Sequence, residues 1–218
     1  MVAIGLSIVP ANIVGAILRE RERNLKHLQL ISGLNLVAYH VVNIWFDIVK
    51  TTVIAFVCAL MFLVWGLQDY YWAIFVLVLW PIVAVPTTHV LAFFFQTEWS
   101  AQFAVILYNL VVLGGLPILV ASLMFNEQTM DTAERMNNGL LFLPEYSLSR
   151  ALLFCGYQEQ YTRFRKSVGD ENYSREAWSP GNFGLNVTAI FAHAFFCVIL
   201  VLMLDNVLGL PNGFKFLL

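Results

Sequence analysis

The sequence predicts an all-α integral membrane protein that forms one transmembrane domain over residues 1–218. The chain is 60% hydrophobic and 12% charged, whereas about a quarter of the residues of a soluble domain are charged. Its charges are also clustered, which leaves long charge-free stretches: 1–18, 51–68, 70–97, 99–126 and 177–204. Since about 20 apolar helical residues cross a bilayer core, these stretches indicate a multi-pass membrane protein.

Five transmembrane helices are expected, near residues 1–18, 47–67, 71–95, 101–125 and 185–204. The first has no basic residues ahead of its apolar run, which is untypical of a cleaved signal peptide. Pro81 and Pro86 should kink the third span, and the run from Gly114 to Pro117 should break or bend the fourth. Two of the three cysteines, Cys58 and Cys197, fall inside spans, so a disulfide framework is not expected.

A charged segment, residues 19–33, separates the first two spans, and we expect it to form an amphipathic helix. Glu22 and Lys26 stand at i, i+4, a stabilising order for a helix. Leu28 and Ile31 repeat at helical spacing, and Gly33 is placed as a helix stop. Two interpretations remain open: a helix gripped by a cytoplasmic partner, or a helix whose basic residues meet anionic lipid head groups. In the first interpretation, Leu28 would be buried near the centre of the interface with the partner, and Arg21 would lie at the exposed rim of that interface.

The basic residues of this segment predict the topology. Short loops rich in arginine and lysine stay in the cytoplasm, which places residues 19–33 inside and the N-terminus outside. Counting spans onward puts residues 126–184 outside and the C-terminus in the cytoplasm. Asn172 then lies outside, in an Asn-Tyr-Ser sequence that is a candidate N-glycosylation site.

The predicted outer region contains an apolar stretch, residues 139–155, which is interrupted by Pro144, Glu145 and Arg150. Each apolar half is too short to span a bilayer, so an outer re-entrant or interfacial helical hairpin is expected. The alternative is a sixth span with an internal Glu-Arg pair, which would move the C-terminus outside.

Several polar residues fall within or beside the predicted spans. Asp47 and Lys50 lie one turn apart at the expected inner end of the second span, where a pair that neutralises itself is the favoured interpretation. His89 and His193 are expected to be hydrogen-bonded core histidines rather than proton relays or metal ligands. Prolines and glycines in the third and fourth spans suit a pathway that opens and closes.

The chain lacks the sequence motifs of self-contained catalysis. It contains no Gly-x-x-x-x-Gly-Lys-Ser/Thr phosphate loop, no His-Glu-x-x-His, no zinc-spaced cysteines and no Gly-x-Ser-x-Gly. We therefore expect no catalytic residues, no metal site, no cofactor and no ATPase activity in this chain, and no nucleic-acid partner.

Two motifs resemble A-subfamily ABC transporters. The first runs from Glu20 to Gly33 and is followed by Tyr39, Trp45, Phe46 and Asp47, similar to the family's cytoplasmic coupling segment. Within this run, the candidate coupling residues are Glu20, Arg21, Glu22, Arg23, Lys26, His27, Leu28, Gln29, Ser32 and Gly33. The second, residues 142–152, resembles a Phe-Pro-x-x-x-Leu-x-Arg-x-Leu motif before the last helix of a membrane half. The resemblance covers roughly residues 3–205.

The resemblance implies the second to sixth helices of one membrane half, with the architecture of a type-2 ABC exporter. It implies lipid transport driven by a nucleotide-binding domain that carries ATP and Mg and contacts residues 20–33. It also implies a second transmembrane half, facing the first and fourth spans of this chain. The leading helix, the large outer domain and the ATPase domain are absent from the 218 residues, so these partners belong to a longer protein or to other chains. The alternative function is a stand-alone membrane scaffold or channel-like module with a lipid-interface helix.

Overall fold

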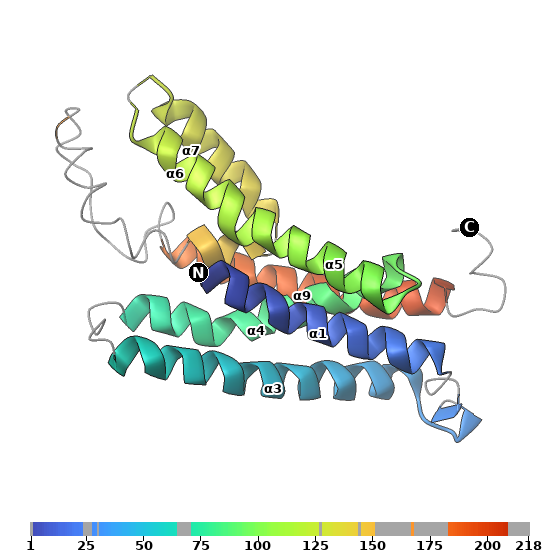
Figure 1. Ribbon diagram of the computed structural model, residues 1–218. Coiled ribbons are helices and arrows are strands. Elements are labelled where there is room, and N and C mark those ends of the chain that lie inside the picture. Colours follow the sequence, from blue (N-terminus) through green and yellow to red (C-terminus); the bar gives the residue numbers. More distant parts are fainter. Residues whose placement is uncertain are drawn as a thin grey trace.

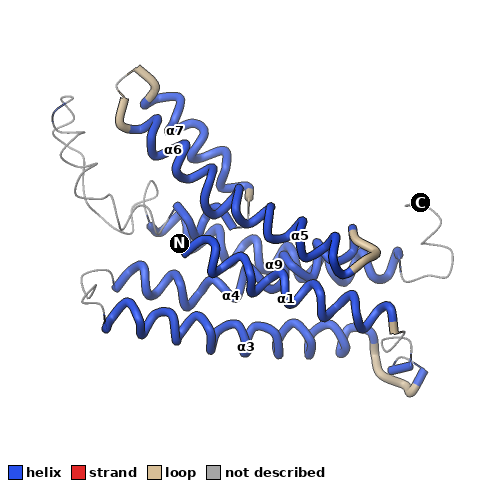
Figure 2. The backbone as a smooth tube through the Cα atoms, viewed as in Figure 1, coloured by secondary structure: helices blue, strands red, loops and turns tan. Residues whose placement is uncertain are grey.

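The computed structural model describes residues 2–23, 28–29, 31–64, 71–126, 128–143, 145–150, 167 and 183–208. All regular structure in these residues is helical, as the sequence predicted (Figure 2). The α-helices are α1 (Val2–Glu22), α3 (Leu36–Val64), α4 (Tyr71–Leu91), α5 (Glu98–Asn109), α6 (Leu116–Met124), α7 (Met130–Gly139) and α9 (Phe183–Leu208). Between them lie the 3-10 helices η2 (Ala92–Phe94) and η4 (Leu140–Phe142) and the π-helix η3 (Leu110–Gly115).

Four stretches of the described chain are long and apolar enough to cross a membrane: Leu36–Met61, Ile74–Phe94, Glu98–Met124 and Val187–Asp205. They coincide with the second to fifth predicted spans, with the second beginning earlier than expected. The first predicted span forms α1, which is helical as expected but carries four charged residues in its last turn. It is not among the four stretches, and its crossing of the membrane stays a prediction.

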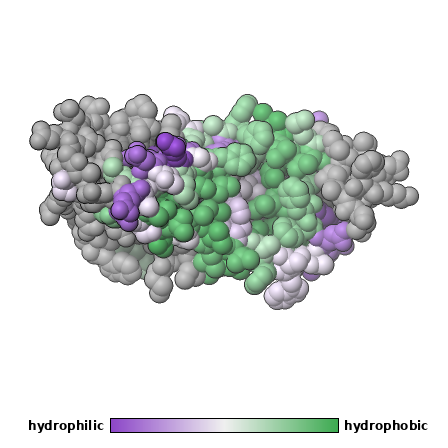
Figure 3. All heavy atoms as spheres, turned by 90° about the horizontal axis from the view of Figure 1, so that it is seen from above, coloured by the Kyte–Doolittle hydropathy of each residue, from purple (hydrophilic) through white to green (hydrophobic). Residues whose placement is uncertain are grey.

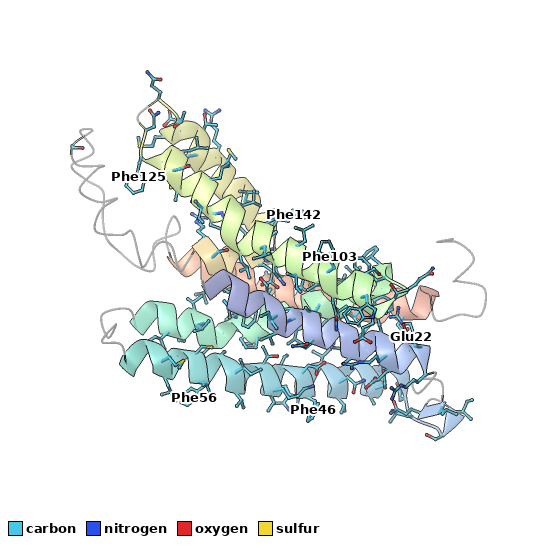
Figure 4. All side chains as sticks on the ribbon, in the orientation of Figure 1. Glu22, Phe46, Phe56, Phe103, Phe125 and Phe142 are labelled. Carbon is cyan, nitrogen blue, oxygen red and sulfur yellow. The ribbon has the colours of Figure 1, made fainter. Side chains whose placement is uncertain are left out.

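Helix α4 is the centre of the bundle. Of its most apolar stretch 67% is buried inside the protein, against 22% for α3. It packs against α3 and α9 and also against α1, which in turn lies along α5 (Figure 1). Trp80 and Val83 of α4 are fully buried in the core. The remaining surfaces of α3, α5 and α9 are apolar and exposed; Figure 4 shows Phe46 and Phe56 on the side of α3 that faces away from the other helices.

The helix ends gather at two opposite ends of the bundle (Figure 1). The end of α1, the start of α3, η2, the start of α5 and the end of α9 lie together, and we term residues 19–23, 28–29, 31–40, 92–102 and 205 the charged end. The start of α1, the start of α4 and residues 140–143 and 145–150 lie at the opposite end. Hydrophobic residues cover the middle of the face seen in Figure 3, with hydrophilic ones toward its two ends. This distribution is the one expected of a membrane-embedded bundle.

The structure revises two predicted boundaries at the charged end. Residues 19–22 continue α1 without a break, because alternating glutamate and arginine are good helix formers. The second span begins at Leu36, where the Asn35 side chain accepts a hydrogen bond from the backbone N–H of Val37 at 2.8 Å. Asp47 therefore lies 11 residues into α3, roughly 16 Å along its axis, rather than at its inner end.

Two helix disruptions were predicted. Helix α4 passes through Pro81 and Pro86 as one continuous α-helix, and the kink expected there stays a prediction. The Thr87 hydroxyl donates a hydrogen bond to the Val83 carbonyl at 2.8 Å, one turn earlier. In the fourth span, both glycines are the last two residues of the π-helix η3, which separates α5 from α6. The fourth span is thus interrupted where the sequence predicted.

Beyond the fourth span the chain turns back on itself. Helices α6 and α7 pack as a hairpin that leans away from the bundle (Figure 1). Residues 145–150 are helical and every one of them is buried. This position agrees with a re-entrant segment at the opposite end, while residues 144 and 151–155 of the predicted hairpin lie outside the described residues.

Candidate functional site

The charged last turn of α1 is the centre of the candidate site. It presents Glu20, Arg21 and Glu22 at the end of a long apolar helix, and Figure 4 shows Glu22 at this end of the bundle. Arginines in the last turn interact favourably with the negative end of the helix dipole. The turn therefore has a local electrostatic reason to stay helical as it leaves the apolar region.

Arg21 fixes this turn to the loop between α4 and α5. Its Nη1 donates a hydrogen bond to the carbonyl of Ala92 at 3.0 Å, and its guanidinium lies over the Phe93 ring, 5.3 Å from the centroid. Burial lowers the pKa of Arg21, while nearby Asp205 and Tyr39 raise it; an arginine remains charged under all these influences. Arg21 is thus partly buried between helices and is not the rim charge that the pattern alone suggested.

Glu20 begins a chain of contacts that reaches α3 and α9. The Tyr39 hydroxyl donates a hydrogen bond to Glu20 Oε2 at 3.2 Å, and the Tyr39 ring packs edge-on against His40, with centroids 5.1 Å apart. His40 Nε2 in turn pairs with Asp205 Oδ2 at 2.5 Å, and both side chains are buried. These contacts connect three helices that are distant in the sequence.

A second pair of contacts joins α1 to α5. Arg19 Nε lies 3.4 Å from Glu98 Oε1, and the Gln102 amide donates to the same oxygen at 3.2 Å. The two helices approach closely here, since a Cβ on Gly15 would come within 2.2 Å of Gln102 Nε2. Through these residues the last turn of α1 contacts α3, η2 and α5, and Tyr39 and His40 of α3 extend the connection to Asp205 of α9.

The segment that follows α1 leaves apolar side chains exposed. Leu28 is 60% exposed and Ile31 70% exposed. Residues 28, 29 and 31 are helical, and the Ser32 hydroxyl donates to the Gln29 carbonyl at 2.6 Å. Gly33 has a φ of 97°, a backbone conformation that favours glycine, as its prediction as a helix stop requires. Lys26 and His27 lie outside the described residues, as does the candidate glycosylation site Asn172.

A separate polar cluster lies within the span of α3. Asp47 Oδ1 is 2.6 Å from Lys50 Nζ, and Asp47 Oδ2 is 3.0 Å from His89 Nε2. The Lys50 ammonium also lies over the Phe46 ring at 4.6 Å. This confirms both the self-neutralising Asp47–Lys50 pair and the hydrogen-bonded core role of His89.

Within the described residues no group of three or more histidine, cysteine, aspartate or glutamate side chains is arranged to hold a metal ion. The chemistry of the charged end is therefore that of hydrogen bonds and ion pairs. Sequence reasoning did not find the His40–Asp205 and Arg21–Ala92 contacts. One signal was available: Asp205 is a lone acid at the end of an otherwise charge-free span, where a buried partner is the usual requirement.

The apolar spans, the central α4 and the polar end define the membrane domain of a multi-pass protein. Residues 1–203 match the family described as ABC-2 family transporter protein. The chain belongs to this family of transporter membrane proteins. Among known proteins, it is 26% identical over 204 residues to ATP-binding cassette sub-family A member 2 of Homo sapiens, covering 87% of this chain.

Other relatives belong to the same subfamily or carry a transporter name. The chain is 26% identical over 216 residues, 94% of its length, to the retinal-specific phospholipid-transporting ATPase ABCA4 of Mus musculus. It is 21% identical over 195 residues, 88% of its length, to the ABC transporter ced-7 of Caenorhabditis elegans. The chain spans only 8%, 9% and 11% of the lengths of the human, mouse and nematode proteins.

Proposed function

We propose that this chain is the membrane-spanning part of an ATP-binding cassette transporter that moves lipids, driven by a nucleotide-binding domain outside the 218 residues. Its membership of the ABC-2 transporter family supports the transporter role. The lipid substrate is proposed from relatives whose names describe phospholipid transport. ATP and Mg would be bound by the nucleotide-binding domain and not by this chain.

The charged end is the proposed site of coupling, and the exposure of Leu28 and Ile31 is the observation that carries this proposal. Two large aliphatic side chains in a polar segment are suited to the centre of a protein interface. The segment follows α1 in the sequence, and the last turn of α1 contacts η2, α3 and α5. A nucleotide-binding domain that displaces residues 28–33 would therefore act on α1 and, through it, on the other helices.

A second transmembrane half is proposed to cover the exposed face of α1. This face carries Gly5, Ile8, Asn12 and Ala16 at helical spacing, all exposed. An exposed amide such as Asn12 is costly in lipid, whereas small and polar residues favour helix–helix packing in membranes. The exposed aromatic residues of α5, Trp99 and Phe103, extend the same proposal to the fourth span.

The test is reconstitution in liposomes, with this chain alone and with a complete transporter that contains it. The chain alone should show no vanadate-sensitive ATP hydrolysis and no ATP-dependent translocation of a fluorescent phospholipid. The complete transporter should show both, and a variant with an inactive phosphate loop in the nucleotide-binding domain is the control. ATP turnover by the chain alone would contradict the proposal, and ion conductance by the chain alone would favour the channel-like alternative.

A further inference from the structure

Residues 145–150, which we term the outer segment, are buried at the opposite end of the bundle. Leu148 is fully buried in a core cluster with Leu6 of α1, Trp80 of α4 and Ile190 of α9. The outer segment thus packs against helices from the beginning, middle and end of the chain.

Two hydroxyl groups fix the outer segment further. The Tyr146 hydroxyl donates to Asn137 Oδ1 of α7 at 2.8 Å, and the Ser149 hydroxyl lies 3.4 Å from the Val112 carbonyl in η3. Displacement of the segment would therefore disturb the π-helix that interrupts the fourth span. This gives the outer segment a direct connection to a deformable part of the bundle.

Glu145 is the unusual residue of the outer segment. Its side chain is 1% exposed, and the indole N–H of Trp80 donates a hydrogen bond to its Oε2 at 3.0 Å. Among the described residues no cation forms an ion pair with this carboxyl group. A buried carboxylate with one neutral donor is unfavourable, and the protonated acid is the form that fits this site.

Among the residues that the structure describes, the titratable groups around Glu145 do not supply a compensating charge. Tyr108 of α5 and Cys197 of α9 lie close enough to interact with it electrostatically, and a phenol and a thiol are ordinarily neutral near pH 7. Arg150 acts on the phenol of Tyr146, and His193 of α9 faces the Phe142 backbone. Burial raises the pKa of Glu145 to about 7, and the Trp80 hydrogen bond only partly opposes this.

We propose that Glu145 is a proton-binding site whose protonated form holds the outer segment in the bundle, and that loss of this proton releases the segment. The proposal stands independently of the transported substrate and of the nucleotide-binding domain. Docking of the outer segment then depends on the pH of the compartment that this end of the bundle faces.

The direction of the pH dependence follows from linkage. The carboxyl pKa is about 7 in the docked segment and 4.5 in its ordinary, solvated state, so the docked state binds more protons. Docking is therefore strongest at low pH. It weakens by about tenfold per pH unit between the two pKa values and changes no further above the higher one.

The experiment uses the full chain in lipid nanodiscs, with Cys58, Cys155 and Cys197 replaced by alanine. Ser147→Cys places a thiol in the outer segment at a fully buried position. Thr132→Cys, at an exposed position on α7, corrects for the pH dependence of the thiol reaction. The rate of labelling by an impermeant maleimide at the first position is divided by the rate at the second.

The ratio of the labelling rate at position 147 to that at position 132 should rise about tenfold or more from about pH 5 to about pH 8. In Glu145→Gln, which is neutral throughout, it should stay low and flat. A flat ratio in the chain that retains Glu145, or an equal rise in the glutamine variant, would overturn the proposal. Infrared spectra provide a second test: a protonated-carboxyl band below pH 7 should be absent from Glu145→Gln, and identical spectra would also overturn it.

Discussion

The two ends of the bundle join their helices by different means. At the charged end the contacts are ion pairs and hydrogen bonds, several of them open to solvent: Arg19 is 52% exposed and Glu98 23% exposed. At the opposite end the outer segment is packed in the core, with Leu148 0% exposed. Exposed polar contacts contribute little free energy each and can be exchanged for contacts to a partner. Buried apolar contacts are strong and are lost together.

This difference indicates a division of roles. The charged end is suited to remodelling, because its apolar residues Leu28 and Ile31 are uncovered and its exposed polar contacts, such as Arg19–Glu98, are individually weak. At the opposite end, apolar packing and, as we propose, one proton at Glu145 hold the outer segment in the bundle.

Truncating Leu148 to alanine should destabilise the protein most. The substitution removes a fully buried side chain from the largest core cluster, and such changes cost about 3 kcal/mol. Thermal unfolding of the purified protein in detergent should report this loss. Phe142→Ala is the matched control, because Phe142 is 81% exposed and should be nearly neutral. Equal effects of the two substitutions would contradict the buried position of the outer segment.

Replacing Arg21 with glutamine should have a smaller but measurable effect. It removes the hydrogen bond to the Ala92 carbonyl and the stacking on Phe93, a loss of about 1–2 kcal/mol. Arg19→Gln is the control on the same turn, since its half-exposed ion pair should contribute less than about 1 kcal/mol. Unfolding measured for both variants should rank Arg21 above Arg19. The reverse order would mean that Arg21 does not fix α1 to the α4–α5 loop.

Much of the fold was predictable because apolar length is a local signal. The four long spans follow from charge-free stretches, and the positive φ of Gly33 agrees with its prediction as a helix stop. The start of α3 was missed because the second span was placed by the charge-free stretch 51–68, although residues 36–46 are also mostly apolar. The Asn35 cap, one residue before a helical run, was the local signal that identifies the true start.

The candidate site was less predictable because its contacts join distant residues. His40 and Asp205 are 165 positions apart, and Arg21 bonds a backbone carbonyl 71 positions away. A backbone acceptor has no sequence signature, so nothing marked Ala92 as a partner. The Asp47–Lys50 pair, in contrast, could be predicted from its i, i+3 spacing alone. The contact of Asp47 with His89 could not, because it forms only when α3 packs on α4.

The most direct test of the central claim is Leu28→Ala in a complete transporter that contains this chain, with lipid translocation and ATP hydrolysis measured together. We predict that translocation per ATP hydrolysed falls by about tenfold or more, because an apolar anchor at an interface centre dominates binding. Joint neutralisation of Arg21, Arg23 and Lys26, with binding to anionic vesicles as its readout, tests the lipid-interface alternative. Coupling that survives Leu28→Ala, together with vesicle binding lost on charge removal, would contradict the assignment of residues 20–33 as the coupling segment.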